Sequence, residues 1–359
     1  MGLIRIILAL FVVIYHCGQF DGFKIMQGPE AVQTFYIISG FYMALILNEK
    51  YKDQANAYKL FITNRLLKLF PIYWIIVLLI LIISLSFAVL SKGENWGFLN
   101  IFNQHAGHVG VSGYLYIIVS NIILLGQDVA LFLGLNPESG DLFFTNTYAA
   151  SNPPVYSFML VPQAWTISIE IMFYLVAPLF IRKKVWVITT LCLIAMALKY
   201  YLFSAGFNYD PWSYRFFPAE MLYFLLGVLS YKLYTATKSF AIPKWASLFF
   251  FIVVLAVIFL FPFLQNHLNK HFFYIGFALA IPMIFRFTKY NKWDRIIGDY
   301  SYPIYIVHVF VKGLVFMLWG GASNVSIPVL IGSIGLAFLF NYFINKKIEI
   351  YRQSRVNFA

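Results

Sequence analysis

The stretch LFPIYWIIVLLILIISLSFAVLS, residues 69–91, decides the fold class. It contains no charged side chain over its whole length. At a rise of about 1.5 Å per residue, a helix of this length crosses the roughly 30 Å of hydrocarbon in a bilayer. The stretch therefore predicts a transmembrane helix.

Similar apolar runs recur along the chain. The other runs that we expect to span a membrane are residues 3–20, 30–48, 165–181, 185–204, 216–235, 246–264, 272–288, 298–319 and 326–345. Charged residues make up only 11% of the 359 residues, against about 25% in a soluble domain. The sequence predicts an all-α, polytopic membrane helix bundle with about ten transmembrane helices. This single domain, residues 1–345, is followed by a short basic cytoplasmic tail, residues 346–359.

Lys and Arg gather in alternate loops of this bundle. The basic clusters fall within residues 50–68, 182–184, 232–244, 286–295 and 346–355. Because cytoplasmic loops retain Lys and Arg, we expect both termini in the cytoplasm. The expected location is a bacterial inner (plasma) membrane. Membrane lipids, and no nucleic acid, are then the expected surroundings of a chain with net charge +12. No small-residue cleavage site follows the first run, which predicts a retained helix rather than a signal peptide.

A further apolar run, residues 112–135, is irregular. Its interruptions are Gly113, Asn121, Gly126 and Asp128. The orientation of the neighbouring runs leaves no room for a simple span here. We expect a re-entrant segment or an extracytoplasmic cap, because irregular backbone at membrane depth must be buried in protein or face water. The alternative is that 112–135 spans and another run does not.

Ionisable side chains inside apolar spans are costly, so each marks a candidate functional site. Arg5 and His16 are 11 residues apart, which is about three helical turns. They should project from nearly the same face, with Arg5 near the cytoplasmic edge and His16 near the outer end. A histidine there can take a proton from a hydroxyl near neutral pH. The structural alternative is an Arg at the headgroups and a His packed at the interface.

Two more sets of charged residues suggest chemistry. Glu170 lies about one turn into its helix, at a depth comparable to that of His16, and could orient its imidazole. A structural ion pair or a helix-terminus charge is the alternative. Arg65 and Lys68 lie three residues apart at the cytoplasmic side. They could bind phosphate groups, or only anchor the helix.

A late helix carries three polar side chains on one face. Ser301, Tyr305 and His308 are spaced four and three residues apart, with His308 near mid-membrane. They form a candidate polar pocket, or a satisfied hydrogen bond between helices. The two cysteines have neither metal-ligand spacing nor a disulfide framework, and we expect no metal site.

Five segments resemble, in order, the motifs of the acyltransferase-3 family of integral membrane acyltransferases. They are RIILALFVVIYH (5–16), FYIISGF (35–41), NRLLKLFPIYW (64–74), WTISIEIMFYLVAPL (165–179) and SYPIYIVH (301–308). The sequence departs from the family pattern at Gln33, Asn64, Lys68 and Ile171. Of these, Asn64 and Lys68 stand where the family usually has arginine. Lysine binds phosphate as a point charge rather than bidentately.

The resemblance implies a membrane-bound O-acyltransferase that depends on acyl-CoA, with acetyl-CoA as the expected donor. The implied acceptor is a hydroxyl of an extracytoplasmic or lipid-linked glycan, such as lipopolysaccharide O-antigen, capsule or exopolysaccharide. The expected catalytic residues are His16 and Glu170. The expected donor-binding residues are Arg5, Arg65 and Lys68. Ser39, Ser301, Tyr305 and His308 are further polar pocket candidates.

No metal is needed for such a transfer, because the thioester is already activated. Two other classes stay open on the residues alone. One is a transporter or flippase in which His and Glu form a proton relay. The other is a membrane protein that binds acyl-CoA without consuming it.

Overall fold

The structure, a computed structural model, describes residues 1–18, 24–52, 54, 56–264, 267–320 and 325–356. The described residues are largely helical, as expected, apart from one antiparallel hairpin of strands β1 (Leu133–Leu135) and β2 (Leu142–Phe144). Residues 19–20 of the first predicted run and 357–359 of the predicted tail lie outside the described residues.

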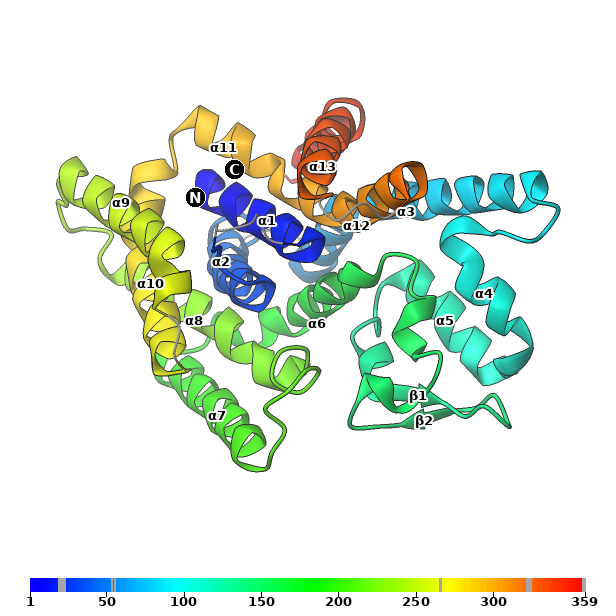
Figure 1. Cartoon of the computed structure of the whole chain (residues 1–359). Coiled ribbons are helices and arrows are strands. Elements are labelled where there is room, and N and C mark those ends of the chain that lie inside the picture. The colour runs from blue at the N-terminus through cyan, green and yellow to red at the C-terminus, as the bar shows by residue number, and fades with distance from the viewer. Residues whose placement is uncertain (19–23, 53, 55, 265–266, 321–324, 357–359) are drawn as a thin grey trace.

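A helix is present in each of the ten runs predicted to span. These helices are α1 (Gly2–Cys17), α2 (Gly28–Glu49), α3 (Ala57–Leu90), α6 (Trp165–Phe180), α7 (Val185–Ser204), α8 (Phe217–Ala236), α9 (Lys244–Leu260), α10 (His267–Thr288), α12 (Ser301–Trp319) and α13 (Ser326–Phe340). Among the described residues, eight helical stretches are long and apolar enough to cross a membrane, and α1 and α8 are not among them. The chain is therefore an integral membrane protein with a polytopic helical bundle (Figure 1).

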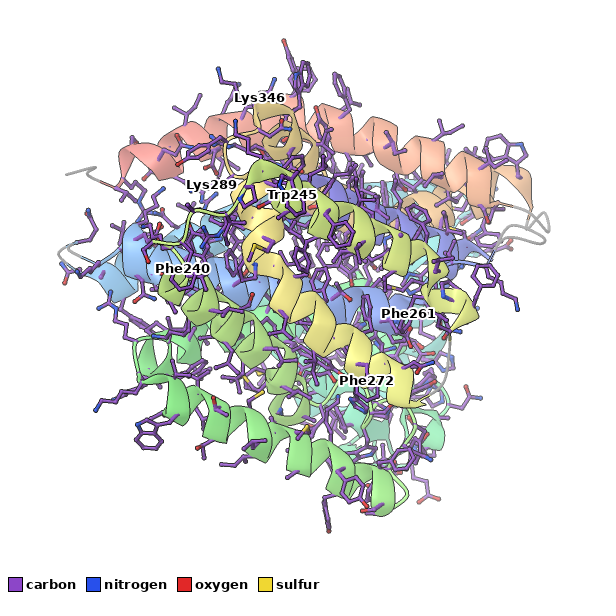
Figure 2. All side chains as sticks on the ribbon, turned by 90° about the vertical axis from the view of Figure 1, so that its left-hand side faces the viewer. Phe240, Trp245, Phe261, Phe272, Lys289 and Lys346 are labelled. Carbon is purple, nitrogen blue, oxygen red and sulfur yellow. The ribbon has the colours of Figure 1, made fainter. Side chains whose placement is uncertain are left out.

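The bundle has two distinct ends. Figure 2 shows Phe240 and Lys289 toward one end of the helices and Phe261 toward the other. At the first end, the Arg182 guanidinium donates a hydrogen bond to the Leu47 carbonyl at 2.9 Å. We call this the basic end, because the loops rich in Lys and Arg meet there, and we call the opposite one the cap end.

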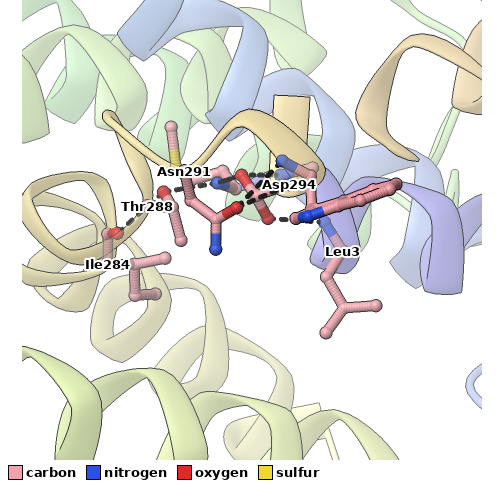
Figure 3. Close-up of polar contacts among 8 residues, drawn as sticks. Leu3, Ile284, Thr288, Asn291 and Asp294 are labelled. Carbon is pink, nitrogen blue, oxygen red and sulfur yellow. Dashed lines mark hydrogen bonds and ion pairs between the residues drawn. The ribbon is translucent and has the colours of Figure 1, made fainter. Parts of the chain in front are cut away.

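At the basic end, the short helix α11 (Lys292–Asp299) caps the start of α1 (Figure 3). The Asp294 carboxylate accepts hydrogen bonds from the Gly2 and Leu3 backbone N–H groups at 2.8 and 2.9 Å. The first N–H groups of a helix have no partner within it, and a carboxylate there also favours the helix dipole. A Cβ on Gly298 would lie only 2.7 Å from the Gly2 Cα atom, so these two glycines allow the close approach.

A second close approach joins α2 and α8 at the centre of the bundle. A Cβ on Gly40 would lie 2.0 Å from the Phe224 carbonyl oxygen, and one on Gly227 would lie 2.0 Å from that of Ile37. Small residues let two transmembrane backbones pack closely in this way. Gly40 thus faces α8 while the preceding Ser39 is free to face elsewhere.

As expected, the run 112–135 contains no helix long enough to span; it belongs to a compact segment, residues 97–159, that we call the cap. Its helix α5 (Val111–Ile123) is too short to cross a bilayer and lies with α4 (Asn100–His105) and the hairpin beside the bundle (Figure 1). The cap has a hydrophobic cluster of its own, made of Val109, Ile117, Ala130, Leu135, Val155, Phe158 and Met159. The Tyr73 hydroxyl of α3 donates to the Asn121 carbonyl at 2.6 Å and ties the cap to the bundle.

The expected tail begins as a helix, α14 (Lys346–Ser354), which continues α13 through a π-helical turn at Asn341–Asn345. Arg352 donates through Nε to the Asn64 carbonyl of α3 at 2.7 Å. Arg355 reaches the Thr63 hydroxyl at 2.8 Å. Residues 346–356 therefore pack against α3 and help to build the basic end.

Candidate active site

A cavity of about 570 Å³ extends from the basic end into the bundle. Its walls come from α1, α2, α3, α6, α10, α11, α12 and α14. The predicted site residues in its lining are Arg5, Ser39, Arg65, Lys68, Glu170, Ser301 and Tyr305. Seven of the nine predicted site residues thus meet in one cavity, although they lie on five helices.

The part of the cavity near the basic end is strongly cationic. The lining includes seven Lys or Arg side chains and four Asp or Glu side chains among the described residues. Arg5 and Lys68 form no ion pair within the described chain. The buried Nε of Arg65 has no hydrogen-bond partner among the described residues either. This cluster therefore suits an anionic ligand such as a phosphate.

The deep part of the cavity is polar but less charged. The Ser39 hydroxyl donates to Glu170 Oε1 at 2.5 Å. The hydroxyls of Thr166 and Tyr305 lie 2.7 Å apart, and Tyr305 also donates to the Gln163 carbonyl at 3.1 Å. Thr166 and Tyr305 both line the cavity, so their contact forms part of its inner wall.

The two histidines lie beyond this inner wall, toward the cap end. His16 is exposed near the end of α1, whereas His308 of α12 is fully buried. His16 Nδ1 lies 2.8 Å from His308 Nε2. His308 Nδ1 lies 2.5 Å from the carbonyl oxygen of Tyr305, the residue whose side chain lines the cavity. Tyr305 thus connects the cavity with the histidine pair.

Glu170 was expected to orient His16, but the structure gives these two residues other partners. Among the described residues, Glu170 bonds to Ser39 inside the cavity, whereas the ring of His16 bonds to His308. Similar depth did not imply contact, because α6 turns the Glu170 side chain toward the cavity.

A family model described as an acyltransferase domain matches residues 1–346. The chain belongs to the acyltransferase-3 family. Comparisons with curated proteins and with solved structures gave no match. The family assignment makes the protein a membrane acyltransferase and favours this class over the transporter that the residues alone left open.

Three polar pocket candidates of the acyltransferase have clear structural partners. The Ser301 hydroxyl donates to the Gly298 carbonyl at 2.7 Å and so stabilises the junction of α11 and α12. His308 was expected near mid-membrane as a polar contact, and it contacts His16 near the end of α1. Ser39, in the segment that resembles the second-helix motif, donates its hydrogen bond to Glu170.

Several ionisable residues of this acyltransferase are absent from the predicted site. Lys312, one turn after His308, donates through Nζ to the backbone carbonyl of His16 at 2.5 Å. Glu220 is buried and pairs with Lys199 at 2.5 Å. Each lies inside a predicted apolar span, so the cost of burying charge in a membrane was a signal that could have found all three.

Proposed function

We propose that this acyltransferase moves an acetyl group from acetyl-CoA to a hydroxyl of an extracytoplasmic or lipid-linked glycan. The observation that carries the proposal is a single cavity that joins a cationic cluster at the basic end to the wall beside His16 and His308. Lipopolysaccharide O-antigen, capsule and exopolysaccharide are the acceptor classes that we propose.

The cationic cluster would hold the phosphate groups of the donor. Arg5, Arg65 and Lys68 lack carboxylate partners among the described residues, so they are available to an anion. The unpartnered Nε of Arg65 supports this assignment, since buried polar atoms normally have a hydrogen-bond partner. A phosphate oxygen of the donor would then accept the hydrogen bond that Arg65 Nε does not make within the described residues.

The thioester end of the donor would lie in the deep part of the cavity, near Ser39 and Glu170. Tyr36 also lines the cavity, and its buried hydroxyl has no partner among the described residues. Glu170 therefore acts within the donor pocket in this proposal. The acetyl group reaches His16 once the contact between Thr166 and Tyr305 has parted.

The chemistry needs one base and one leaving group. His16 takes the proton of the acceptor hydroxyl, whose oxygen attacks the thioester carbonyl carbon. The new C–O ester bond forms as the C–S bond breaks, and the proton passes from the imidazolium to the departing CoA thiolate. No oxidant, reductant or metal enters this balance.

The two ends of the bundle would then face different compartments. The positive-inside rule supports a cytoplasmic basic end with both termini, and an extracytoplasmic cap, in a bacterial inner membrane. The donor enters from the cytoplasm, and the acceptor meets the exposed His16 at the cap end.

The test measures free CoA released by the purified protein in nanodiscs, with acetyl-CoA and a crude surface-glycan fraction. The wild type is compared with His16→Ala. His16 is not among the described residues that line the cavity, so this variant should leave donor binding intact. We expect CoA release that depends on the acceptor and is lost in His16→Ala. Calorimetry should show equal acetyl-CoA affinity for both proteins.

Two results would overturn the proposal. Full acceptor-dependent activity of His16→Ala would remove the histidine from the reaction. Movement of a glycan or ion by reconstituted protein, without consumption of acetyl-CoA, would instead support the transporter reading.

A further inference from the structure

The groups around His16 and His308 determine which of the two rings donates the hydrogen bond between them. The two nitrogens are 2.8 Å apart while the ring centres are 4.9 Å apart, and the ring planes differ by only 14°. The nitrogens are much closer than the ring centres, so the rings meet edge to edge. This is the geometry of an N–H···N hydrogen bond.

The Tyr305 carbonyl determines which ring nitrogens of His308 and His16 carry a hydrogen. A carbonyl oxygen can only accept, so His308 Nδ1 must carry a hydrogen to bond it at 2.5 Å. His308 is fully buried and pairs with no carboxylate among the described residues, which favours its neutral form. In a neutral imidazole the second nitrogen accepts. His308 Nε2 therefore accepts from His16 Nδ1–H, which leaves the lone pair on His16 Nε2.

We propose that His308 is a positioning residue that fixes the proton of His16 on Nδ1 and so makes Nε2 the base. The tautomer stands on the geometry alone, and its use in acyl transfer rests on the proposed function. The role expected for a carboxylate is thus taken by a backbone carbonyl acting through a neutral histidine.

Helix α12 holds His16 at a second point. The Lys312 ammonium group donates to the His16 backbone carbonyl at 2.5 Å, one turn beyond His308. Ring and backbone are thus both fixed by one rigid helix. Lys312 and Arg215 are the charged side chains that interact with His16 in the described chain.

A neutral partner has a consequence for the reaction. When His16 Nε2 takes the acceptor proton, the imidazolium has no carboxylate beside it to stabilise the charge. It therefore passes the proton on readily to the CoA thiolate. Because a carboxylate would stabilise the charged form, it would slow this second transfer.

The direct test is nitrogen NMR of the protein labelled with ¹⁵N-histidine, in nanodiscs and without substrate. The chain has six histidines, and the signals absent from His16→Ala identify those of His16. We expect a protonated Nδ1 and an unprotonated Nε2 in the wild type. A protonated Nε2 in the wild type would overturn the inference, whatever the activity of the protein.

The kinetic test compares two variants of His308. In His308→Gln the amide oxygen can accept from His16 Nδ1, whereas His308→Leu fills the site without an acceptor. We expect His308→Gln to keep kcat within about tenfold of the wild type. His308→Leu should give a mixture of His16 tautomers. Its kcat should fall by about 100-fold or more, because a general base contributes roughly 10²–10⁴-fold to the rate. Its affinity for acetyl-CoA should be unchanged.

Ser301→Ala is the matched control, because it removes a buried hydrogen bond from the same helix at the basic end. It should leave the His16 signals unchanged. An equal loss of kcat in His308→Gln and His308→Leu would contradict the positioning role. An unchanged His16 spectrum in His308→Leu would contradict it as well. Inactivity of the wild type with the expected tautomer would count against the proposed function alone.

Discussion

The Ser39 hydroxyl of α2 donates a hydrogen bond to the Glu170 carboxylate of α6 at 2.5 Å, inside the cavity. Ser39→Ala would leave that carboxylate oxygen without its donor. A hydrogen bond to a charged group contributes about 1.5–3 kcal/mol, so we expect a lower Tm in detergent. Ser86→Ala, which removes an exposed hydroxyl bonded within α3, should change little. Equal shifts in the two variants would contradict the importance of the Ser39–Glu170 bond.

Arg65→Ala should weaken the binding of CoA about tenfold, since a charge-assisted hydrogen bond contributes about 1.5–3 kcal/mol. Isothermal titration calorimetry at two salt concentrations measures this effect. Lys68→Met should act in the same direction and reduce the salt dependence. The control is Lys183→Ala, which removes an exposed charge near the basic end outside the cavity lining. If Arg65→Ala binds CoA as tightly as this control does, the phosphate assignment is wrong.

Gly40→Ala should destabilise the bundle although alanine is the better helix former. The new Cβ would lie 2.0 Å from the Phe224 carbonyl oxygen, a backbone atom that cannot turn aside. Overpacking of this kind costs typically about 1–3 kcal/mol. Gly276→Ala is the control, because a Cβ there meets nothing within 4 Å. Thermal unfolding and size-exclusion profiles should separate the two, and a normal profile for Gly40→Ala would refute the close packing.

Asp128 should make the stability of the cap depend on pH. Burial raises the pKa of its carboxyl above the usual 3.8, although the Ser168 hydroxyl donates to it at 2.6 Å. The folded protein therefore binds this proton more tightly than the unfolded chain. The free energy of unfolding then falls as the pH rises from 3.8 through the raised pKa.

Asp128→Asn should remove this pH-dependent loss of stability. Tm measured from about pH 4 to 7 should decline less steeply than in the wild type. Asp141→Asn, at an exposed position of the same cap, serves as the control. A steeper decline of Tm in Asp128→Asn would show that the pKa of Asp128 is not raised in the folded protein.

The proposed sidedness can be checked by labelling introduced cysteines in intact cells. A thiol reagent that cannot cross membranes should label His108→Cys in the cap and leave Lys183→Cys at the basic end unlabelled. The native Cys17 and Cys192 are buried and should give little background. The reverse pattern would invert the proposed orientation.

The sequence was sufficient to predict the helices and the cap. Membrane spans are set by length and apolarity, which are local properties, so all ten runs contain helices. The parity of basic loops excluded a simple span at 112–135, and α5 proved too short to cross. The small hairpin β1–β2 was not predicted, because each strand has only three residues.

Seven of the nine predicted site residues line one cavity, but their pairings were not predicted. Depth along a helix follows from residue number, which placed Arg65 near the basic end and His16 near the cap end. The direction in which a side chain turns depends on the helices around it. That is why Glu170 was expected beside His16 and instead bonds to Ser39. His308 was recognised as polar, but its partner lies 292 residues away and could not be read from spacing.

That sequence separation also affects how the protein is made. α1 is translated before the other helices described here, whereas the residue that we propose to position its histidine lies 292 residues further along the chain. A chain that stalls before His308 has an inserted first helix and much of the cavity, but no histidine pair. If His308 positions His16 as proposed, such shortened products have the base without its partner, and we expect them to transfer acyl groups more slowly than chains that include His308.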